Sequence, residues 1–203
     1  GASHHATEDI AVMRALPGMT VVAPGDPIEA AMATRALVAR AGPAYLRLGR
    51  SGEPLVHSDD VDFQIGKAIR VTDGDDVTLI ATGTMLCATV QAGAELAREG
   101  IAARVLSMHT IKPLDVDAVF EAARETRAII TVEEHSIIGG LGSAVAEVLA
   151  ESVDCHVRFK RMGLPSAFTA VGSREFLTKS HSLSVEGIVE SAMQVLELAP
   201  SRA

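Results

Sequence analysis

The sequence predicts an α/β fold in which a mainly parallel sheet carries helices on both faces. Short apolar, β-branched runs alternate with segments of helical periodicity along most of the 203 residues, which is the pattern of strands joined by crossover helices. Hydrophobic residues make up 48% of the chain but aromatic residues only 3%. A core built from Ala, Val, Ile and Leu suits buried parallel strands.

Net charge and hydropathy exclude several classes of partner. The net charge is −8 and the isoelectric point is near 5.3, which argues against nucleic acid as the main partner. No apolar run approaches transmembrane length, and the N-terminus lacks the shape of a signal peptide. We therefore expect no membrane partner and a cytoplasmic protein. Cys87 and Cys155, in a helical and a strand-like pattern, are expected to be buried, reduced thiols.

Residues 1–53 predict the end of an α/β domain rather than a whole one. Their order is helix, strand, helix, strand, with no opening strand of its own, so we expect a truncated α/β remnant. Asp26 followed by Pro27 is a typical start of the second helix. The expected elements are a helix at 7–16, a strand at 20–23, a helix at 27–41 and a strand at 44–48.

Residues 54–62 predict an interdomain linker, and residues 63–203 predict a second, complete α/β domain. Periodicity disappears from Gly49 onward, and Gly, Pro, Ser and Asp dominate up to the end of the linker. Asp73-Gly74 predicts a hairpin that adds an antiparallel strand. The expected elements are strands at 63–71, 77–81, 103–107, 129–133 and 156–159, and helices at 84–99, 173–180 and 184–198 and from residues 115 and 139.

The stretch 133–143, where the strand that begins at Ile129 turns polar and meets a glycine-rich loop, marks the carboxyl edge of this sheet. We favour a structural turn or an interface here, because the glycines follow neither the G-x-G-x-x-G nor the P-loop pattern. Two alternatives remain. The N–H groups at the start of the next helix would bind an anion such as phosphate, and Glu133, Glu134 and His135 would form a carboxylate pair with a base.

Three local strings resemble the transketolase family. Residues 4–19 (HHATEDIAVMRALPGM) are similar to the end of its pyrimidine-binding domain. Residues 108–115 (MHTIKPLD) and 133–143 are similar to its C-terminal domain. The resemblance covers nearly the whole chain, is strongest to the second subunit of split transketolases and weakens after Phe159. It implies that residues 1–53 end the pyrimidine-binding domain and that residues 63–203 form the C-terminal domain.

The resemblance also implies an activity. Transketolases move a two-carbon ketol unit between sugar phosphates, in the pentose phosphate pathway among others, with thiamine diphosphate and Mg²⁺ at an active site between two subunits. We expect this chain to work in such a transferase, as a homodimer or with the cofactor-binding subunit. The family's Gly-Asp-Gly…Asn motif is missing, since the chain has no Asn and Asp73-Gly74-Asp75 is a predicted hairpin. We therefore expect neither cofactor nor metal on this chain alone, and no activity.

Two substrate contacts carry over from the family. His4 matches the catalytic, substrate-binding histidine near the reacting carbons, where an imidazole exchanges hydrogen bonds and protons with substrate oxygens; the alternative is a solvated loop. Arg50 matches the arginine that binds the terminal phosphate of the sugar, a role that suits a guanidinium. The alternative is an exposed arginine at the start of the linker. Arg47 is close enough along the strand to be confused with Arg50.

Other interpretations remain open. A second thiamine enzyme, the β subunit of a 2-oxoacid dehydrogenase or deoxyxylulose phosphate synthase, has the same last domain, although the string at 108–115 favours transketolase. A non-catalytic dimerisation module is the alternative from another class. Within that string, His109 and Lys112 are expected to be a structural histidine and a lysine at the rim, because they lie in a turn beside a proline.

Overall fold

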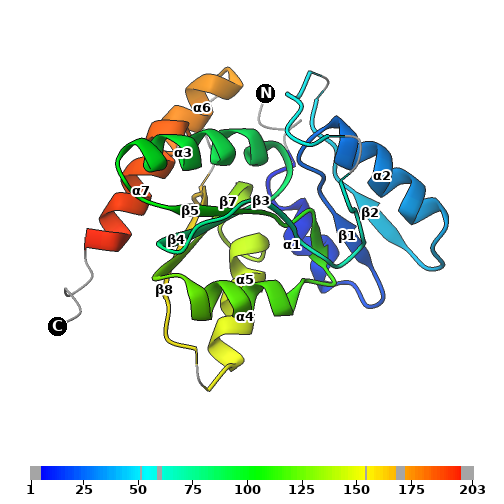
Figure 1. Cartoon of the computed structure of the whole chain (residues 1–203). Coiled ribbons are helices and arrows are strands. Elements are labelled where there is room, and N and C mark those ends of the chain that lie inside the picture. The colour runs from blue at the N-terminus through cyan, green and yellow to red at the C-terminus, as the bar shows by residue number, and fades with distance from the viewer. Residues whose placement is uncertain (1–5, 51, 59–60, 154, 168–171, 198–203) are drawn as a thin grey trace.

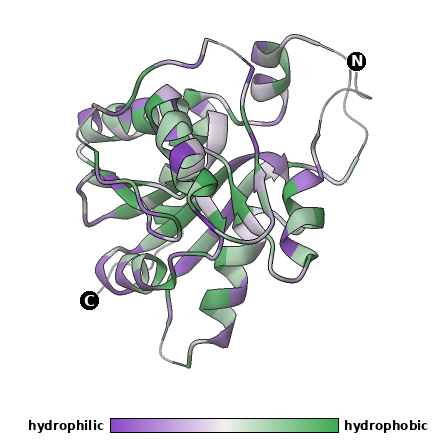
Figure 2. Ribbon diagram, turned by 90° about the vertical axis from the view of Figure 1, so that its right-hand side faces the viewer, coloured by the Kyte–Doolittle hydropathy of each residue, from purple (hydrophilic) through white to green (hydrophobic). Residues whose placement is uncertain are grey.

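A computed structural model describes residues 6–50, 52–58, 61–153, 155–167 and 172–197 (Figure 1). This part of the chain contains a three-stranded sheet and a five-stranded sheet. Figure 2 shows that the strands in the middle of the molecule carry mainly hydrophobic residues, whereas the helices carry hydrophobic and hydrophilic stripes. Within the described ranges, no helix combines the length and apolarity needed to cross a membrane.

The five-stranded sheet confirms the predicted fold class. Its order is β3 (Ile69–Thr72), β5 (Ala103–Ser107), β4 (Val77–Ala81), β7 (Ala128–Ser136) and β8 (Arg158–Leu164). Neighbouring strands are parallel except for β3, which pairs antiparallel with β5. Figure 1 shows helices on both faces: α3 (Leu86–Arg98) and α7 (Val185–Glu197) cover one, and α4 (Val116–Glu125) and α5 (Leu141–Glu151) cover the other. The short α6 (Arg174–Ser180) precedes α7, and a 3₁₀ turn, η2 (Gly83–Met85), precedes α3.

The three-stranded sheet contains strands from both of the domains that the sequence predicts. Strand β1 (Thr20–Val22) pairs in parallel with β2 (Ala44–Leu46) and antiparallel with β6 (Thr110–Lys112). Helices α1 (Asp9–Ala15) and α2 (Pro27–Val38) flank these strands. Strand β6 lies in the range assigned to the C-terminal domain and was expected to be a turn. The strands of residues 1–53 therefore receive a third member from the range 63–203.

The predicted hairpin at Asp73-Gly74 is wrong. Strands β3 and β4 do not pair, because β5 lies between them. Gly74 carries the connection across the start of β5, where an added Cβ would lie 2.5 Å from the carbonyl carbon of Ala103. The connection also donates a backbone hydrogen bond from Asp76 to the carbonyl of Ala102. Glycine is needed here for close passage over a strand rather than for a two-residue turn.

Smaller differences concern strand length and burial. Strand β7 continues through the polar residues to Ser136, and β8 begins at Arg158 instead of residue 156. Cys155 therefore lies before the strand, and Cys87 and Cys155 are half-buried thiols rather than buried ones. On α4, Val116 is 39% exposed, whereas Val119 and Ala123 pack in the apolar cluster beneath the helix.

Three apolar clusters hold the structure together. One fills the space between the five-stranded sheet and helices α3 and α7. The second lies on the opposite face, under α4 and α5. The third joins the three-stranded sheet to helix α5, because it combines residues of α1 and β1 with Ile111 of β6 and Ala144 of α5. The position of α1, and of the segment before it, thus depends on the C-terminal domain.

Candidate functional site

The N-terminal unit meets β7 in a group of polar residues that we call the Arg47 junction: Asp9, Tyr45, Arg47, Glu134 and His135. Arg47 follows β2, and its side chain is mostly shielded from solvent, with 18% exposed. The Arg47 side chain donates to Asp9 Oδ2 at 3.0 Å, to the carbonyl of Ala6 at 2.8 Å and to the carbonyl of Glu134 at 3.0 Å. Tyr45 Oη also donates to Asp9 Oδ2, at 2.6 Å.

His135 is a structural part of this junction. The side chain is fully buried. Its Nδ1 lies 2.7 Å from the carbonyl of Ser136, and its Nε2 accepts from the N–H of Ala11 at 3.3 Å, so these partners assign the proton to Nδ1. Burial lowers the pKa of His135 below its ordinary value, which keeps the ring neutral. Since both nitrogens have protein partners, the interpretation of residues 133–135 as a carboxylate pair with a base is wrong.

The side chain of Glu133, on β7, binds the first N–H groups of helix α5. Its carboxylate accepts from the N–H of Leu141 at 2.7 Å and from that of Gly142 at 2.8 Å. Burial raises the pKa of Glu133 to about 7, although the two backbone donors oppose the rise. These N–H groups were an alternative phosphate site, but the chain's own carboxylate fills it. Gly140 leaves room for this arrangement, because an added Cβ would lie 2.0 Å from Glu133 Oε2.

The favoured interpretation of residues 133–143, a turn and an interface, is confirmed for the contact between the two units. The N–H of Ser136 donates to the carbonyl of Thr7 at 2.8 Å. Arg14, on α1, donates to the carbonyl of Gly139 at 2.7 Å and pairs with Glu147 of α5. Gly139 has a positive φ of 79° and faces Ala11 so closely that an added Cβ would lie 2.5 Å from the alanine methyl.

A second set of buried polar residues binds part of the segment that was expected to be a linker. Glu29 is fully buried, and its carboxylate accepts from Ser107 Oγ at 2.6 Å and from the N–H of Gly25 at 2.6 Å. His57 Nε2 lies 2.7 Å from the same carboxylate. Asp26 caps α2 and also accepts from the N–H groups of residues 56 and 57. Residues 56 and 57 are therefore bound to the N-terminal unit, and Val56 also packs against the apolar cluster under α3 and α7.

The residues of the 108–115 string are structural, as expected. His109 is fully buried, and its ring stacks on Phe63 with centroids 4.0 Å apart. Burial lowers the pKa of His109 to about 4. Lys112 lies at the rim, where its ammonium donates to the carbonyls of Arg14 and Leu16 at 2.8 and 2.7 Å. A cation suits these carbonyls, because they lie at the C-terminal end of α1, the negative end of the helix dipole.

Of the two substrate contacts expected from the sequence, only one falls within the described residues. His4 lies outside them. Arg50 is exposed and follows β2, three residues after Arg47. Its neighbour Gly49 packs against η2, since an added Cβ would lie 2.7 Å from Thr84 Cγ2. The structure thus separates the two arginines: Arg47 binds protein acceptors inside the junction, and Arg50 has no carboxylate partner among the described residues.

Within the described ranges, the His, Cys, Asp and Glu side chains are not clustered for metal binding. No group of three or more His, Cys, Asp or Glu side chains in these ranges could hold a metal ion. The Asp73-Gly74-Asp75 string, the nearest to the family motif, is tied to the protein: Asp73 pairs with Arg70, and Gly74 lies against β5. We therefore derive no chemical step through the cofactor from this chain.

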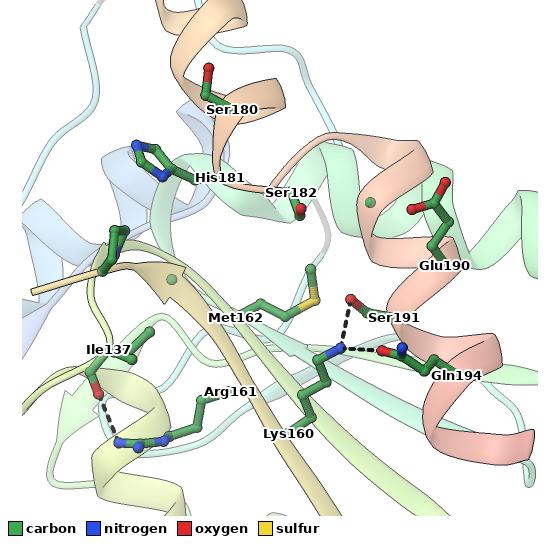
Figure 3. Close-up of a pocket in the computed structure, with 13 residues that line it drawn as sticks. Ile137, Lys160, Arg161, Met162, Ser180, His181, Ser182, Glu190, Ser191 and Gln194 are labelled. Carbon is green, nitrogen blue, oxygen red and sulfur yellow. Dashed lines mark hydrogen bonds between the residues drawn. The ribbon is translucent and has the colours of Figure 1, made fainter. Parts of the chain in front are cut away.

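A separate pocket of about 550 Å³ lies between β8 and the turn that joins α6 to α7 (Figure 3). Lys160 donates to Ser191 Oγ at 3.2 Å and to Gln194 Oε1 at 3.1 Å, while Arg161 points to the other side of the strand and donates to the carbonyl of Ile137 at 2.8 Å. Arg50, the expected substrate residue that the structure describes, does not line this pocket. Its lining comes from residues scattered between 137 and 194, so no local pattern could have indicated it.

Comparison with known proteins was made over the whole sequence. Residues 66–188 match the family described as transketolase, C-terminal domain, and residues 1–53 match transketolase, pyrimidine binding domain. The 6-deoxy-6-sulfo-D-fructose transketolase subunit SqwH of Clostridium sp. (strain MSTE9) is 41% identical over 197 residues, covering 97% of this chain and 61% of that protein. An apulose-4-phosphate transketolase subunit of Phocaeicola vulgatus is 42% identical over 198 residues, covering 97% and 62%.

A solved structure described as a split gene transketolase, inactive beta4 tetramer, shares the fold. Its TM-score is 0.85 at 41% identity, and the match covers 98% of this chain and 64% of that one. The chain therefore spans about three fifths of the length of the curated relatives named above.

We predict that His57→Gln lowers the free energy of unfolding at pH 6 by about 1–3 kcal/mol, because it leaves the buried carboxylate of Glu29 without its cationic partner. Burial alone would lower the pKa of His57, but the hydrogen bond to Glu29 and the charges of Glu29 and Asp26 raise it above its ordinary value. The stabilisation is therefore complete below about pH 6.5 and is lost as the pH rises through the folded-state pKa.

Urea denaturation of the wild type and of His57→Gln, at pH 6 and at pH 8.5, measures the difference in their free energies of unfolding. The exposed His156 supplies the control, since His156→Gln should change the free energy of unfolding by less than about 0.5 kcal/mol. A His57→Gln deficit that stays constant or grows at pH 8.5 would contradict the assignment of a protonated His57.

Proposed function

The chain belongs to the transketolase family, and on this premise we propose that it is the C-terminal part of a thiamine-diphosphate-dependent transketolase. The complete enzyme would transfer a two-carbon ketol unit between sugar phosphates. The observation that carries the proposal is the joint match to two transketolase domains, together with 41–42% identity to transketolase subunits over 97% of the chain. We assign the enzyme to carbohydrate metabolism, including the pentose phosphate pathway, in the cytoplasm.

Our proposed division is residues 1–53 as the end of the pyrimidine-binding domain, 54–62 as the linker and 63–203 as the C-terminal domain. In this view the chain supplies substrate contacts and an interface, while thiamine diphosphate and Mg²⁺ are held by other parts of the enzyme. The partner is the cofactor-binding subunit or domain, or a second copy in a homodimer.

The role proposed for Arg50 is to bind the terminal phosphate of the sugar. A guanidinium offers paired N–H donors to phosphate oxygens. Arg50 is exposed after β2, at the carboxyl edge of two parallel strands, where an α/β sheet presents its ligand-binding loops. The role proposed for His4 is to exchange hydrogen bonds and a proton with oxygens at the reacting carbons.

We predict that Arg50→Ala in the complete enzyme lowers kcat/KM for phosphorylated acceptor sugars by about 10- to 100-fold, the value of a charge-assisted contact. Unphosphorylated analogues of the same sugars should lose less than about threefold, since they have no phosphate to bind. Steady-state kinetics of ketol transfer, measured with the phosphorylated and the unphosphorylated acceptors, test this role. The matched control is Arg40→Ala, at another exposed arginine. Equal losses for both acceptor types would remove the phosphate role.

We predict that His4→Ala lowers kcat by about 10²- to 10⁴-fold, the usual contribution of general acid–base catalysis, with the melting temperature unchanged. The adjacent His5→Ala is the matched control and should keep most of the activity. Wild-type kcat in the His4 variant would place this histidine in a solvated loop without a catalytic role.

A further inference from the structure

We propose that Arg47 is a positioning residue that fixes residues 6–9, which follow His4 in the chain, relative to Arg50. The inference rests on the proposed function, because His4 and Arg50 are substrate contacts only there. Arg47 itself is not assigned any contact with substrate. Its role follows from what its side chain binds and from where those partners lie along the chain.

The guanidinium of Arg47 connects three segments that are far apart in sequence. Its acceptors are the carbonyl of Ala6 in the N-terminal segment, the carboxylate of Asp9 at the start of α1 and the carbonyl of Glu134 in β7. Only the planar fork of an arginine presents donors in several fixed directions at once, whereas lysine has a single compact ammonium. The geometry therefore requires Arg rather than any cation.

Burial makes the ion pair at the centre of this arrangement strong. The side chain of Asp9 is 10% exposed and that of Arg47 is 18% exposed, so water screens their attraction less than at a surface. Asp9 Oδ2 accepts from both Tyr45 and Arg47, while Asp9 Oδ1 has no hydrogen-bond partner among the described residues. Loss of Arg47 would leave a poorly hydrated carboxylate at the start of α1, which would then move toward water.

The same strand of the C-terminal domain also supports the Arg50 side. Glu134 accepts from Arg47 through its carbonyl, and its carboxylate accepts from Thr84 Oγ1 at 2.5 Å. Thr84 in turn lies against Gly49, the residue before Arg50. Glu134 of β7 thus contacts both the Arg47 guanidinium, which binds residues 6–9, and Thr84, which packs against the residue before Arg50.

This arrangement gives the C-terminal domain a part in substrate selection. The distance between the reacting carbons and the terminal phosphate is set by the sugar, so the protein must hold its two contacts at a matching separation. Displacement of a catalytic group by about 1 Å can reduce a rate by about 10²-fold. The Arg47 junction is where the described structure fixes residues 6–9 relative to the strand that ends before Arg50.

The test is Arg47→Lys in the complete enzyme, with Arg14→Lys as the matched control. Arg14 is also on the N-terminal unit, is similarly shielded (16% exposed) and joins α1 to the α5 region, but it does not contact residues 6–9. Lysine at position 47 keeps a charge for Asp9 and cannot bind all three acceptors. Two measurements are made: kcat and KM with a phosphorylated acceptor, and hydrogen exchange of the peptide that covers residues 6–12.

We expect Arg47→Lys to lower kcat by about 10- to 100-fold, with faster exchange at residues 6–9 and with the exchange of β4 and β5 unchanged. Arg14→Lys should leave kcat within about threefold of wild type. Wild-type kcat in Arg47→Lys, or a loss matched by Arg14→Lys, would overturn the positioning role. A complete wild-type enzyme without ketol-transfer activity would refute the proposed function instead, and unchanged exchange at residues 6–9 would then still overturn the role of Arg47.

Discussion

The pairing of β6 with β1 is the constraint on which the rest of the structure depends. Strand β1 has only three residues, all of them buried, and β6 covers the edge that β2 leaves open. An uncovered edge would expose backbone groups to any other strand. Because β6 belongs to the C-terminal domain, the pairing fixes the N-terminal unit to that domain and brings Ile111 into the cluster beneath α1. The position of α1 and of the segment before it follows from there.

Buried charge then makes the contact between the units specific. An apolar interface tolerates sliding, but a buried carboxylate is costly unless its partners are in place. Glu29 has its partners only when the segment around His57 and the end of β5 are both docked. Asp9 depends in the same way on Arg47 and Tyr45. Glu133 differs, since its donors lie nearby on α5 and it stabilises the local turn. The two long-range groups therefore select one arrangement of the units.

The sequence allowed the fold class and most elements to be predicted because their signals are local. Asp26-Pro27 and Asp115 mark helix starts, and both aspartates do cap their helices. Strand β6 could not be recognised, because three residues beside a proline show no periodicity and their partner lies about 90 residues away. The hairpin at Asp73-Gly74 was a local signal that the crossing over β5 overrode.

The candidate site was predictable only in part, and for the same reason. Arg50 and His4 came from a resemblance of short strings, which identifies residues but not their surroundings. The difference between Arg47 and Arg50 lies in acceptors 38 to 87 residues away from Arg47, beyond the range of any local pattern. His135 likewise resembled a possible base, and only the partners of both its ring nitrogens show that it is structural.

We propose that this chain contributes substrate contacts and an interface while the cofactor is held elsewhere. Isothermal titration of thiamine diphosphate with Mg²⁺ into the 203-residue chain tests that claim most directly. Our account predicts no saturable heat with the chain alone and saturable binding once the cofactor-binding part of the enzyme is present. Stoichiometric binding to the chain alone would contradict the account, because a diphosphate and metal site would then exist among residues to which we assign none.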